Sequence, residues 1–251
     1  MRATALILCG GRATRMGGVD KPLQPFQGRA LVHHVIERIA PQTGGRILIS
    51  ANRHLDDYRR LRHPVLPVPL PGFPGPLAGI LAGLTALADA RTAPSATGTT
   101  AADTDGARAV DRGSDDRPPG DHSAGDRGPG DGNDRVGTDW LLVVGGDCPW
   151  LPTDLLDRLA AGLAPDHSAA MALGREAPGE PLRPQPLASL IHVRHRAGLA
   201  AALDAGERRV EGWVRSLPLA RVAFDRPADE CAFANINDRS ELERLERLDR
   251  G

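Results

Sequence analysis

The first regular pattern in the chain reads ATALILCGGRATRMGGVDKP, residues 3–22. An apolar run, Ala3 to Leu8, passes directly into a loop that holds four glycines, two arginines and a lysine. Glycines allow backbone N–H groups to close around phosphate oxygens, and the cations neutralise the phosphate charge. Pro22 follows the lysine, so the loop is not a Walker A loop, and it lacks the glycine spacing of a dinucleotide fingerprint. We interpret the stretch as a buried strand followed by a phosphate-binding loop, with an ordinary glycine turn as the alternative.

Lys21 is the only lysine among 31 basic residues. The abundance of Ala, Gly, Arg and Pro indicates a coding sequence rich in G and C, in which arginine replaces lysine wherever it can serve. A planar guanidinium cannot copy a compact ammonium fitted against phosphate oxygens. We therefore expect Lys21 to contact phosphate, with chance retention of one lysine as the alternative.

A second strand-like run, Trp140 to Val144, ends in Gly145-Gly146-Asp147. This places a carboxylate at the carboxyl end of a buried strand, level with the glycine loop of the first strand. A hard oxygen ligand at this point could hold Mg²⁺ against nucleotide phosphates. The alternative is an aspartate that caps its own turn.

The rest of the pattern alternates strands with helices, which predicts an α/β fold with a mostly parallel sheet covered on both faces. Ligands of such sheets bind at the carboxyl ends of the strands. The expected elements are a helix at Ala30–Ile39, a strand at Arg46–Ser50, a helix at Leu77–Ala90, a helix N-capped by Thr153, a helix at His195–Ala205 ended by Gly206, and a last helix with a capping box at Ser240 and Glu243.

The segment from Arg91 to Thr138 differs in composition from the rest of the chain. It contains no Leu, Ile, Phe, Tyr, Trp or Met and only two Val. Such a segment cannot bury enough apolar surface to order itself. We expect a disordered surface loop inside one domain that spans residues 1–251, because the elements on its two sides complete a single pattern.

The charge balance and the cysteines exclude several classes of protein. With 31 Lys and Arg against 32 Asp and Glu, the chain lacks the net positive charge that would attract nucleic acid or an anionic membrane. No apolar run approaches the roughly 18–20 residues that span a bilayer, so we expect a soluble, cytoplasmic protein. Three cysteines, Cys9, Cys148 and Cys231, form neither a disulfide framework nor a zinc spacing, and we expect them to be small buried residues.

Six segments, in this order, resemble the bacterial molybdenum cofactor guanylyltransferases, within the wider nucleotidyltransferase fold. The first alone marks only nucleotidyltransferases of a broad type, whereas all six together are specific. The resemblance implies a Rossmann-like three-layer nucleotidyltransferase fold in a single domain. The segments are Leu8–Lys21, Ala51–His54, Pro74–Gly79, Asp147–Pro149, Gly206–Val210 and Asn235–Asn237.

The resemblance also implies roles for individual residues. Lys21 would contact phosphate, Asp147 would bind Mg²⁺, and Arg15 would complete the catalytic group. The nucleotide site would further include Leu8, Cys9, Gly10, Gly11, Gly18, Ser50 and Val68. The acceptor side would include Arg208, Arg209, Asn235 and Asn237. Without the resemblance, the arginines are typical of a solvated helix end, and the asparagines of a turn and N-cap before the last helix.

Two departures from the family bear on the choice of base. The family commonly has an asparagine at the position of Ser50, and an acidic residue where this chain has Leu66 to Leu70, around Val68, with no acid. Guanine presents two adjacent donors that a carboxylate can accept. The missing acid therefore weakens the expectation for GTP, although backbone carbonyls of the same stretch could accept those donors.

The implied reaction is transfer of GMP from GTP to the terminal phosphate of molybdenum-bound molybdopterin, with Mg²⁺ as cofactor and pyrophosphate as leaving group. Contact with molybdenum-insertion proteins and acceptor molybdoenzymes is implied as well. Two alternatives stay open: a related nucleotidyltransferase that uses CTP or another acceptor, and a nucleotide-binding regulator without turnover. Arg15, Lys21 and Asp147 argue against the regulator, because a binder needs no metal carboxylate.

Overall fold

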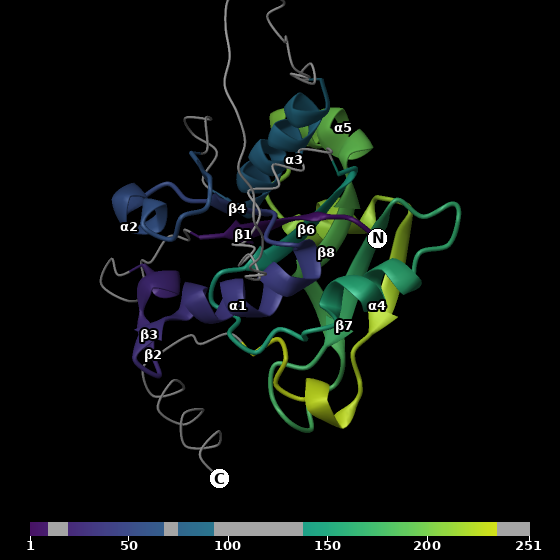
Figure 1. The fold of residues 1–251 in the computed structure, drawn as a ribbon. Helices are drawn as coiled ribbons and strands as arrows, with labels where there is room; N and C mark the ends of the chain where they lie inside the picture. Colours follow the sequence, from purple (N-terminus) through teal and green to yellow (C-terminus); the bar gives the residue numbers. More distant parts are fainter. Residues whose placement is uncertain (10–19, 68–74, 93–137, 235–251) are drawn as a thin grey trace, which may run out of the picture.

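A computed structural model describes residues 1–9, 20–67, 75–92 and 138–234 of the chain. These residues build one seven-stranded sheet in the order β5-β4-β1-β6-β8-β7-β9 and a two-stranded β2-β3 hairpin (Figure 1). The strands of the large sheet are β1 (Thr4–Leu8), β4 (Ile47–Ser50), β5 (Val65–Leu66), β6 (Trp140–Gly145), β7 (Ala169–Gly174), β8 (Arg183–His192) and β9 (Leu219–Ala223). The hairpin strands are β2 (Pro25–Phe26) and β3 (Arg29–Ala30).

The large sheet is mostly parallel, as the sequence predicts. β1 pairs in parallel with both β4 and β6, although β6 follows far later in the chain. Strands from before and after the segment at residues 93–137 therefore lie side by side in one sheet. Among the described strands of this sheet, β8 alone runs opposite to its neighbours, β6 and β7.

Helices cover both faces of the sheet, which makes three layers (Figure 1). They are α1 (Leu31–Thr43), α2 (Leu55–Arg59), α3 (Pro76–Thr92), α4 (Leu155–Ala161), α5 (Arg196–Asp204) and α6 (Val210–Arg215). Short 3₁₀ turns lie at η1 (Lys21–Leu23), η2 (Val193–His195) and η3 (Pro227–Asp229).

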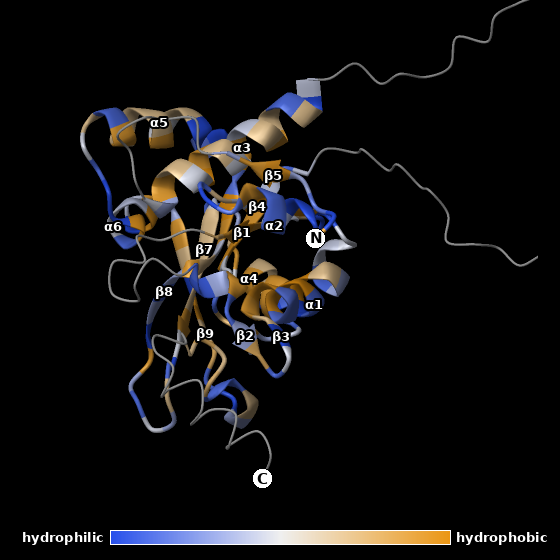
Figure 2. Ribbon diagram, turned by 90° about the vertical axis from the view of Figure 1, so that its left-hand side faces the viewer, coloured by the Kyte–Doolittle hydropathy of each residue, from blue (hydrophilic) through white to orange (hydrophobic). Residues whose placement is uncertain are grey.

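The side chains of β1 alternate between the two faces of the sheet, and their contacts show which helices cover each face. Ala5 and Ile7 pack in one buried cluster with α1 and α4, whereas Leu6 packs in a second cluster with α3, α5 and α6. Successive strand residues point to opposite faces, so one apolar strand supplies both cores. Figure 2 shows the apolar sheet between the two helix layers.

The expected helices and strands agree with the structure to within a few residues, apart from details at their ends. Asp154, not Thr153, is the N-cap residue of α4, and it makes no side-chain cap bond. Gly206 adopts φ +94° just after α5, where a left-handed residue ends a helix. The expected helix after Ser240 lies outside the described residues.

The boundaries of the compositionally distinct segment are narrower than the sequence suggested. Arg91 and Thr92 are the last residues of α3, and Thr138 is buried and shares a hydrogen bond of 2.8 Å with Thr4. The remainder, residues 93–137, lies outside the described part of the chain. Within the described residues, no helix is both long enough and apolar enough to cross a membrane.

Candidate functional site

The carboxyl ends of three parallel strands meet at one edge of the sheet. Beyond the end of β1, the Cys9 backbone N–H donates to the Ser50 carbonyl at 2.8 Å. On the other side, the Gly146 N–H donates to the Leu8 carbonyl at 3.0 Å. These bonds continue the sheet pairing past the strands, so the residues that follow β1, β4 and β6 are held at fixed positions.

Gly146 occupies a narrow space at this edge. A Cβ at this position would lie 2.8 Å from Cys9 Sγ, 3.1 Å from Pro22 Cγ and 3.2 Å from the Leu8 carbonyl oxygen. A side chain there would have to displace part of the site. The glycine therefore allows η1, which carries Lys21, to approach the end of β6.

Lys21 and Asp147 form the ion pair at the centre of the site. Lys21 Nζ donates to Asp147 Oδ2 at 3.0 Å, across 126 positions of sequence. Their side chains are 26% and 22% exposed, so both groups face solvent in part. Cys148 Sγ donates to the other carboxylate oxygen, Asp147 Oδ1, at 3.9 Å. Two of the three residues expected from the sequence to carry the chemistry are thus brought together, and the third, Arg15, lies outside the described residues.

The residues around Asp147 are compatible with Mg²⁺ bound through a single protein carboxylate. Magnesium at nucleotide sites is commonly held by one or two carboxylates together with substrate phosphates and water. Within the described residues, no group of three or more His, Cys, Asp or Glu side chains gathers as a metal site. Asp147 is a partly exposed carboxylate at the strand ends, beside the Lys21 ammonium. Such a carboxylate is suited to a metal ion that binds together with the nucleotide phosphates.

Ser50 lies under the first turn of α3. A Cβ on Gly79 would be 2.6 Å from Ser50 Oγ and 2.8 Å from Leu8 Cδ2. The Gly79 position of the Pro74–Gly79 segment therefore lets α3 pack directly on the ends of β1 and β4. This places Ser50 and Leu8, both expected at the nucleotide site, in one close-packed group.

Arg208 and Arg209 lie on the turn between α5 and α6. Both backbone N–H groups donate to Glu207 Oε1 at 2.8 Å, and these bonds lower the pKa of that exposed carboxyl group. The Arg208 guanidinium donates to the carbonyls of Leu203 and Glu207. The pair belongs to the helix layer opposite α1, on a different element from Lys21.

Several expected site residues lie outside the described part of the chain. They are Gly10, Gly11, Arg15, Gly18, Val68, Asn235 and Asn237. The residues just before Asn235 are described and firmly packed: Phe233 contacts Phe224 edge to face at 5.4 Å, and a Cβ on Gly174 would overlap the Phe233 ring.

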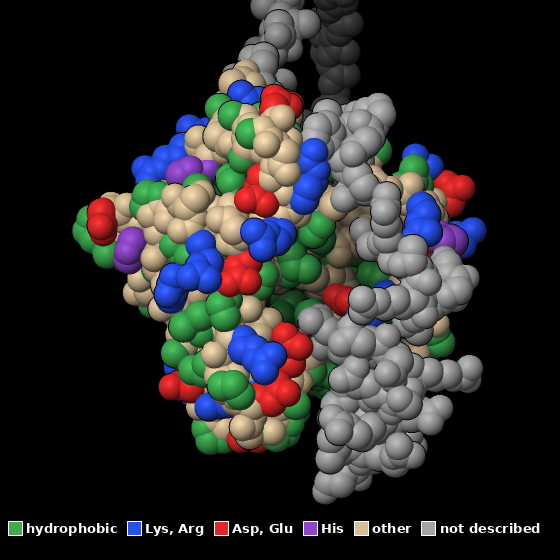
Figure 3. Space-filling view, turned by 180° about the vertical axis from the view of Figure 1, so that it is seen from behind, with side chains coloured by type: hydrophobic (Ala, Val, Ile, Leu, Met, Phe, Trp, Pro, Cys, Tyr) green, Lys and Arg blue, Asp and Glu red, His purple; other side chains and the backbone are tan. Residues whose placement is uncertain are grey.

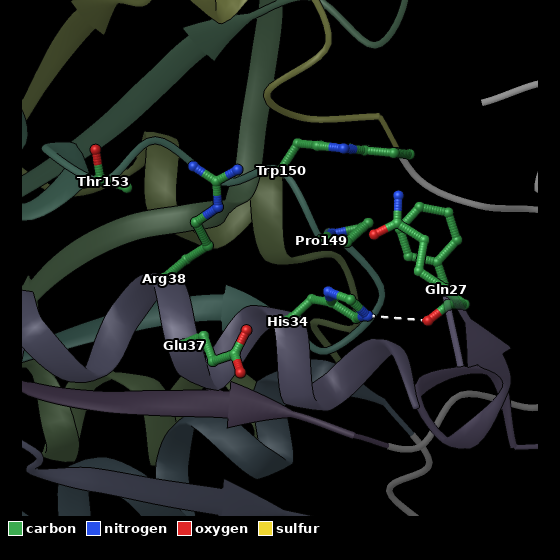
Figure 4. Close-up of a pocket in the computed structure, with 8 residues that line it drawn as sticks. Gln27, His34, Glu37, Arg38, Pro149, Trp150 and Thr153 are labelled. Atoms are coloured by element: carbon green, nitrogen blue, oxygen red, sulfur yellow. Dashed lines mark hydrogen bonds between the residues drawn. The ribbon is translucent and has the colours of Figure 1, made fainter. Parts of the chain in front are cut away.

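A small cavity of about 310 Å³ lies between α1, the β2-β3 hairpin and the segment after β6 (Figure 4). Trp150 and Phe26 meet edge to face at 5.2 Å, and His34 Nε2 lies 3.0 Å from the Phe26 carbonyl oxygen. Arg38 extends into the cavity from α1. His34 of α1 therefore contacts the hairpin through Phe26.

Three buried groups at the site were not expected from the sequence to act together. Asp20 is 5% exposed, Tyr58 on α2 is fully buried, and Cys9 is 3% exposed. Burial raises the pKa of Asp20, while the Tyr58 hydroxyl, His54 and Arg53 lower it. Burial also raises the pKa of Tyr58 and of Cys9, and Asp20 adds to both effects. Asp20 Oδ2 and the Tyr58 hydroxyl are both buried without a hydrogen bond among the described residues.

Charges of both signs are interspersed over the described surface in the view of Figure 3, with no broad area of one sign there. This agrees with the near balance of acidic and basic residues in the sequence.

Comparisons with known proteins agree with this geometry. The model of the MobA-like NTP transferase domain matches residues 5–221. A molybdenum cofactor guanylyltransferase from Cupriavidus taiwanensis is 34% identical over 95% of this chain and 94% of its own length. One from Acidovorax ebreus is 35% identical over 98% and 95%. The crystal structure of molybdopterin-guanine dinucleotide biosynthesis protein A from Archaeoglobus fulgidus has a TM-score of 0.62 and 16% identity, and covers 98% of both chains.

Proposed function

The chain belongs to the MobA-like NTP transferase family, and from this premise we propose that it transfers GMP from GTP to the terminal phosphate of molybdenum-bound molybdopterin. The product is the molybdopterin guanine dinucleotide, and pyrophosphate leaves. The observation that carries the proposal is the Lys21–Asp147 pair of 3.0 Å, which stands at the carboxyl edge of the sheet directly after the glycine loop. Relatives that are 34% and 33% identical over 95% and 96% of this chain are named molybdenum cofactor guanylyltransferases.

In the proposed reaction, a terminal phosphate oxygen of the acceptor attacks the α-phosphorus of GTP. A new P–O bond forms as the bond from the α-phosphorus to the bridging oxygen breaks, and the electron pair leaves on pyrophosphate. Charge gathers on the leaving oxygens, so a fixed cation beside them lowers the barrier. Lys21 supplies this cation, and we assign the same task to Arg15 and to the N–H groups of the glycine loop.

The Lys21–Asp147 pair implies an exchange of partners when nucleotide binds. In the free protein, Asp147 Oδ2 accepts from Lys21 Nζ. Phosphate oxygens then compete for the ammonium, which releases the carboxylate to act as a metal ligand. Asp147 would hold Mg²⁺, which would supply positive charge to neutralise the phosphates. The acceptor phosphate is already ionised, so the protein does not need to supply a general base.

We propose GTP as the preferred donor. The Ser50 carbonyl is engaged by Cys9 N–H, and the Ser50 side chain packs beneath Gly79, so the base would be recognised chiefly by backbone groups and by the stretch around Val68. Carbonyls accept from the two adjacent guanine donors without a carboxylate. Hydrogen bonds to uncharged carbonyls are weaker than hydrogen bonds to a carboxylate. We therefore expect discrimination against ATP of only about ten- to a hundredfold.

We assign the acceptor phosphate to Arg208 and Arg209, and its positioning to Asn235 and Asn237. We also propose that the reaction takes place in the cytoplasm, with molybdenum-insertion proteins and acceptor molybdoenzymes as the protein partners. Three alternatives remain to be separated by experiment: CTP as the donor, another acceptor, and nucleotide binding without turnover.

The test is pyrophosphate release by the purified protein with Mg²⁺, molybdenum-loaded molybdopterin and each of the four nucleoside triphosphates. We expect the highest kcat/KM with GTP and loss of activity by orders of magnitude in Asp147→Asn, because a neutral amide is a poor ligand for a hard cation. Asp157→Asn, an exposed residue of α4, is the matched control and should retain full activity. A kcat/KM for CTP equal to that for GTP contradicts the guanylyl assignment, and no turnover with any nucleotide contradicts the enzyme itself.

A further inference from the structure

The cavity between α1, the β2-β3 hairpin and residues 149–153 is separate from the Lys21–Asp147 pair. Among the described residues, neither member of that pair lines the cavity (Figure 4). Its volume of about 310 Å³ is at the lower end of the range for small-molecule sites. None of the residues assigned above to nucleotide, metal or acceptor lines it. The side chains around the cavity can therefore serve a different ligand.

Arg38 brings a cation to this cavity. Figure 4 shows its guanidinium directed away from α1, between Thr153 and Trp150, and the residue is partly buried. Within the described part of the chain, the guanidinium makes no hydrogen bond or ion pair. It presents five N–H donors in a planar fork, which matches the two oxygens of a carboxylate. These donors are available to an anion in the cavity.

Glu37 does not neutralise Arg38. It is the one acidic residue among the described residues that line the cavity, and the Arg29 guanidinium already holds both of its oxygens, one of them at 2.9 Å. The hydrogen bond from Arg29 lowers the pKa of Glu37. With two arginines against one carboxylate, the charge of these three residues is positive, which favours an anionic ligand over a cationic one.

Aromatic rings form another wall of the cavity. Phe26 meets Trp150 edge to face at 5.2 Å and His34 edge to face at 5.2 Å. Figure 4 shows the Trp150 ring nearly edge-on, with one face turned toward Pro149 and His34. A planar ligand ring can stack on such a face. The combination of one aromatic face with one guanidinium suits a ring that carries a single negative charge.

Hydrogen bonds within the protein hold the walls of the cavity in place. His34 Nε2 lies 3.0 Å from the Phe26 carbonyl oxygen, which ties the hairpin to α1. Further along α1, Gln42 Nε2 donates to the Pro152 carbonyl at 2.9 Å, and Gln42 Oε1 accepts from the Leu156 N–H at 2.8 Å. These two bonds tie the segment after β6 to the same helix. A site whose walls are already fixed loses little conformational entropy when a ligand binds.

We propose that this cavity is a second ligand site, which binds a small aromatic carboxylate. Arg38 donates to the carboxylate oxygens, and the ring of the ligand stacks on Trp150. A carboxylate fits better than a phosphate monoester, which carries nearly two charges against the one unpaired guanidinium. The inference goes beyond the proposed function and does not depend on which reaction the protein catalyses.

Benzoate is the probe for this site, and tryptophan is the reporter. The chain has three tryptophans, which give three indole N–H signals in a ¹H–¹⁵N spectrum of the whole protein, and Trp150→Phe identifies one of them. Benzoate should shift the Trp150 signal saturably and leave those of Trp140 and Trp213 in place. Benzamide, which has the same shape without the charge, should bind about tenfold more weakly, and so should acetate, which has no ring.

Two arginine variants test the role of the guanidinium. Arg38→Gln keeps a polar side chain but removes the charge, and it should weaken benzoate binding about tenfold or more. Arg59→Gln removes an exposed arginine of α2 that does not line the cavity, so it is the matched control and should bind benzoate as the wild type does. The thermal midpoint and the other two indole signals report whether each variant is folded.

The inference is overturned if about 10 mM benzoate produces no saturable shift of the Trp150 signal. Equal affinity of folded Arg38→Gln and wild type, or of benzamide and benzoate, also overturns it, because the guanidinium would then not select the anion. Acetate bound as tightly as benzoate would remove the role of the ring. Displacement of benzoate by GTP with Mg²⁺ would make the cavity part of the nucleotide site. If benzoate binds as expected and no nucleotide is turned over, the proposed function fails and the second site stands.

Discussion

Gly146 shows how closely single residues are fitted at the site. Its missing Cβ leaves room for Cys9 Sγ, Pro22 and the Leu8 carbonyl, all of which would lie within 3.2 Å of that atom. A proline ring and a backbone oxygen cannot turn aside as a flexible side chain can. We expect Gly146→Ala to destabilise the protein by about 1–3 kcal/mol and to lower kcat, because η1 must move. Urea unfolding and pyrophosphate release measure the two effects.

Gly198 is the matched control for that substitution. It lies inside α5, and a Cβ there would meet nothing within 4 Å. Gly198→Ala should stabilise the protein by roughly 0.5–1 kcal/mol, because alanine is the better helix former. Equal effects of the two substitutions on stability would show that crowding at Gly146 is not the cause.

Lys21 is the second residue whose replacement is informative. Lys21→Ala should abolish nucleotidyl transfer, and Lys21→Arg should restore only a small part of it, because a planar fork cannot replace a compact ammonium 3.0 Å from Asp147. The assay is pyrophosphate release from GTP. Arg29→Lys, in an exposed pair with Glu37, is the control and should be fully active. Full activity of Lys21→Arg would refute our interpretation of the lone lysine.

At the scale of elements, Arg158, whose side chain is 12% exposed, ties α4 to β9 and to the segment after it. Arg158 Nη1 donates to both oxygens of Asp229 at 3.0 and 2.9 Å, and Nη2 donates to the Ala223 carbonyl. The guanidinium also stacks over the Phe224 ring at 3.8 Å. Asp229 is 4% exposed, so it depends on this partner. The contact fixes the described residues that lead toward Asn235.

Removal of Arg158 should therefore be costly. Arg158→Ala removes the cationic partner of the buried Asp229 carboxylate, which keeps a hydrogen bond from the Arg226 backbone N–H, and we expect a loss of about 3–5 kcal/mol in the free energy of unfolding. Arg215→Ala breaks an exposed pair with Glu211 and should cost less than about 1 kcal/mol. Denaturant unfolding of both variants provides the comparison. A similar small loss in both would show that the Asp229 contact contributes little.

Elements with strong periodicity were predictable, and β8 shows why others were not. The apolar runs of β1 and β6 and the helical spacing of α1 identify themselves locally. β8 contains Pro184 and Pro186, which argue against a central strand. In the structure, β8 pairs with β6 only from Ala188 onward. Pro184 is paired with Leu173 of β7 alone, and Pro186 lies in the register shift of the β7–β8 pairing, between Gln185 and Ser189.

The same contrast holds at the site. Lys21 and Asp147 were predictable because each follows a buried strand in a recognisable motif. Their direct ion pair of 3.0 Å was not, because it depends on where η1 packs against the end of β6, and no local pattern relates residues 126 positions apart. Long-range packing of polar groups leaves no periodic signal.

For the whole molecule, the ends of the compositionally distinct segment are already joined. Arg91 at the end of α3 forms an ion pair with Asp139, just before β6. The Val193 N–H donates to the Asp139 carbonyl at 2.8 Å, so this residue is held by the sheet as well. A chain that enters and leaves at adjacent, fixed points does not need its intervening residues to hold the fold together.

Replacing residues 93–137 with a short Gly/Ser linker should accordingly preserve folding and turnover. Loop-closure entropy changes by only about 0.6 kcal/mol for each halving of length, so we expect the thermal midpoint to rise by no more than about 5 °C. Calorimetry and the pyrophosphate assay measure both properties. Loss of folding in the shortened chain would show that the segment packs against the domain and is not a loop within it.

The reversed direction of β8 gives the active edge two differently built halves. On the β1–β4–β5 side, the edge is made where parallel strands end. The chain passes from each of these strands to the next through a helix, so a change at the strand ends also affects the helix that follows. On the β7–β8 side, residues 175–182 form a hairpin turn at the same edge. Burial and the charge of Asp147 raise the pKa of the Cys148 thiol, and the charge of Glu176 in this turn adds to the effect. A hairpin turn can lengthen or change composition without moving any helix. In the reaction that we propose, the architecture would hold the nucleotide half of this edge constant, while the hairpin half could diversify toward new acceptors.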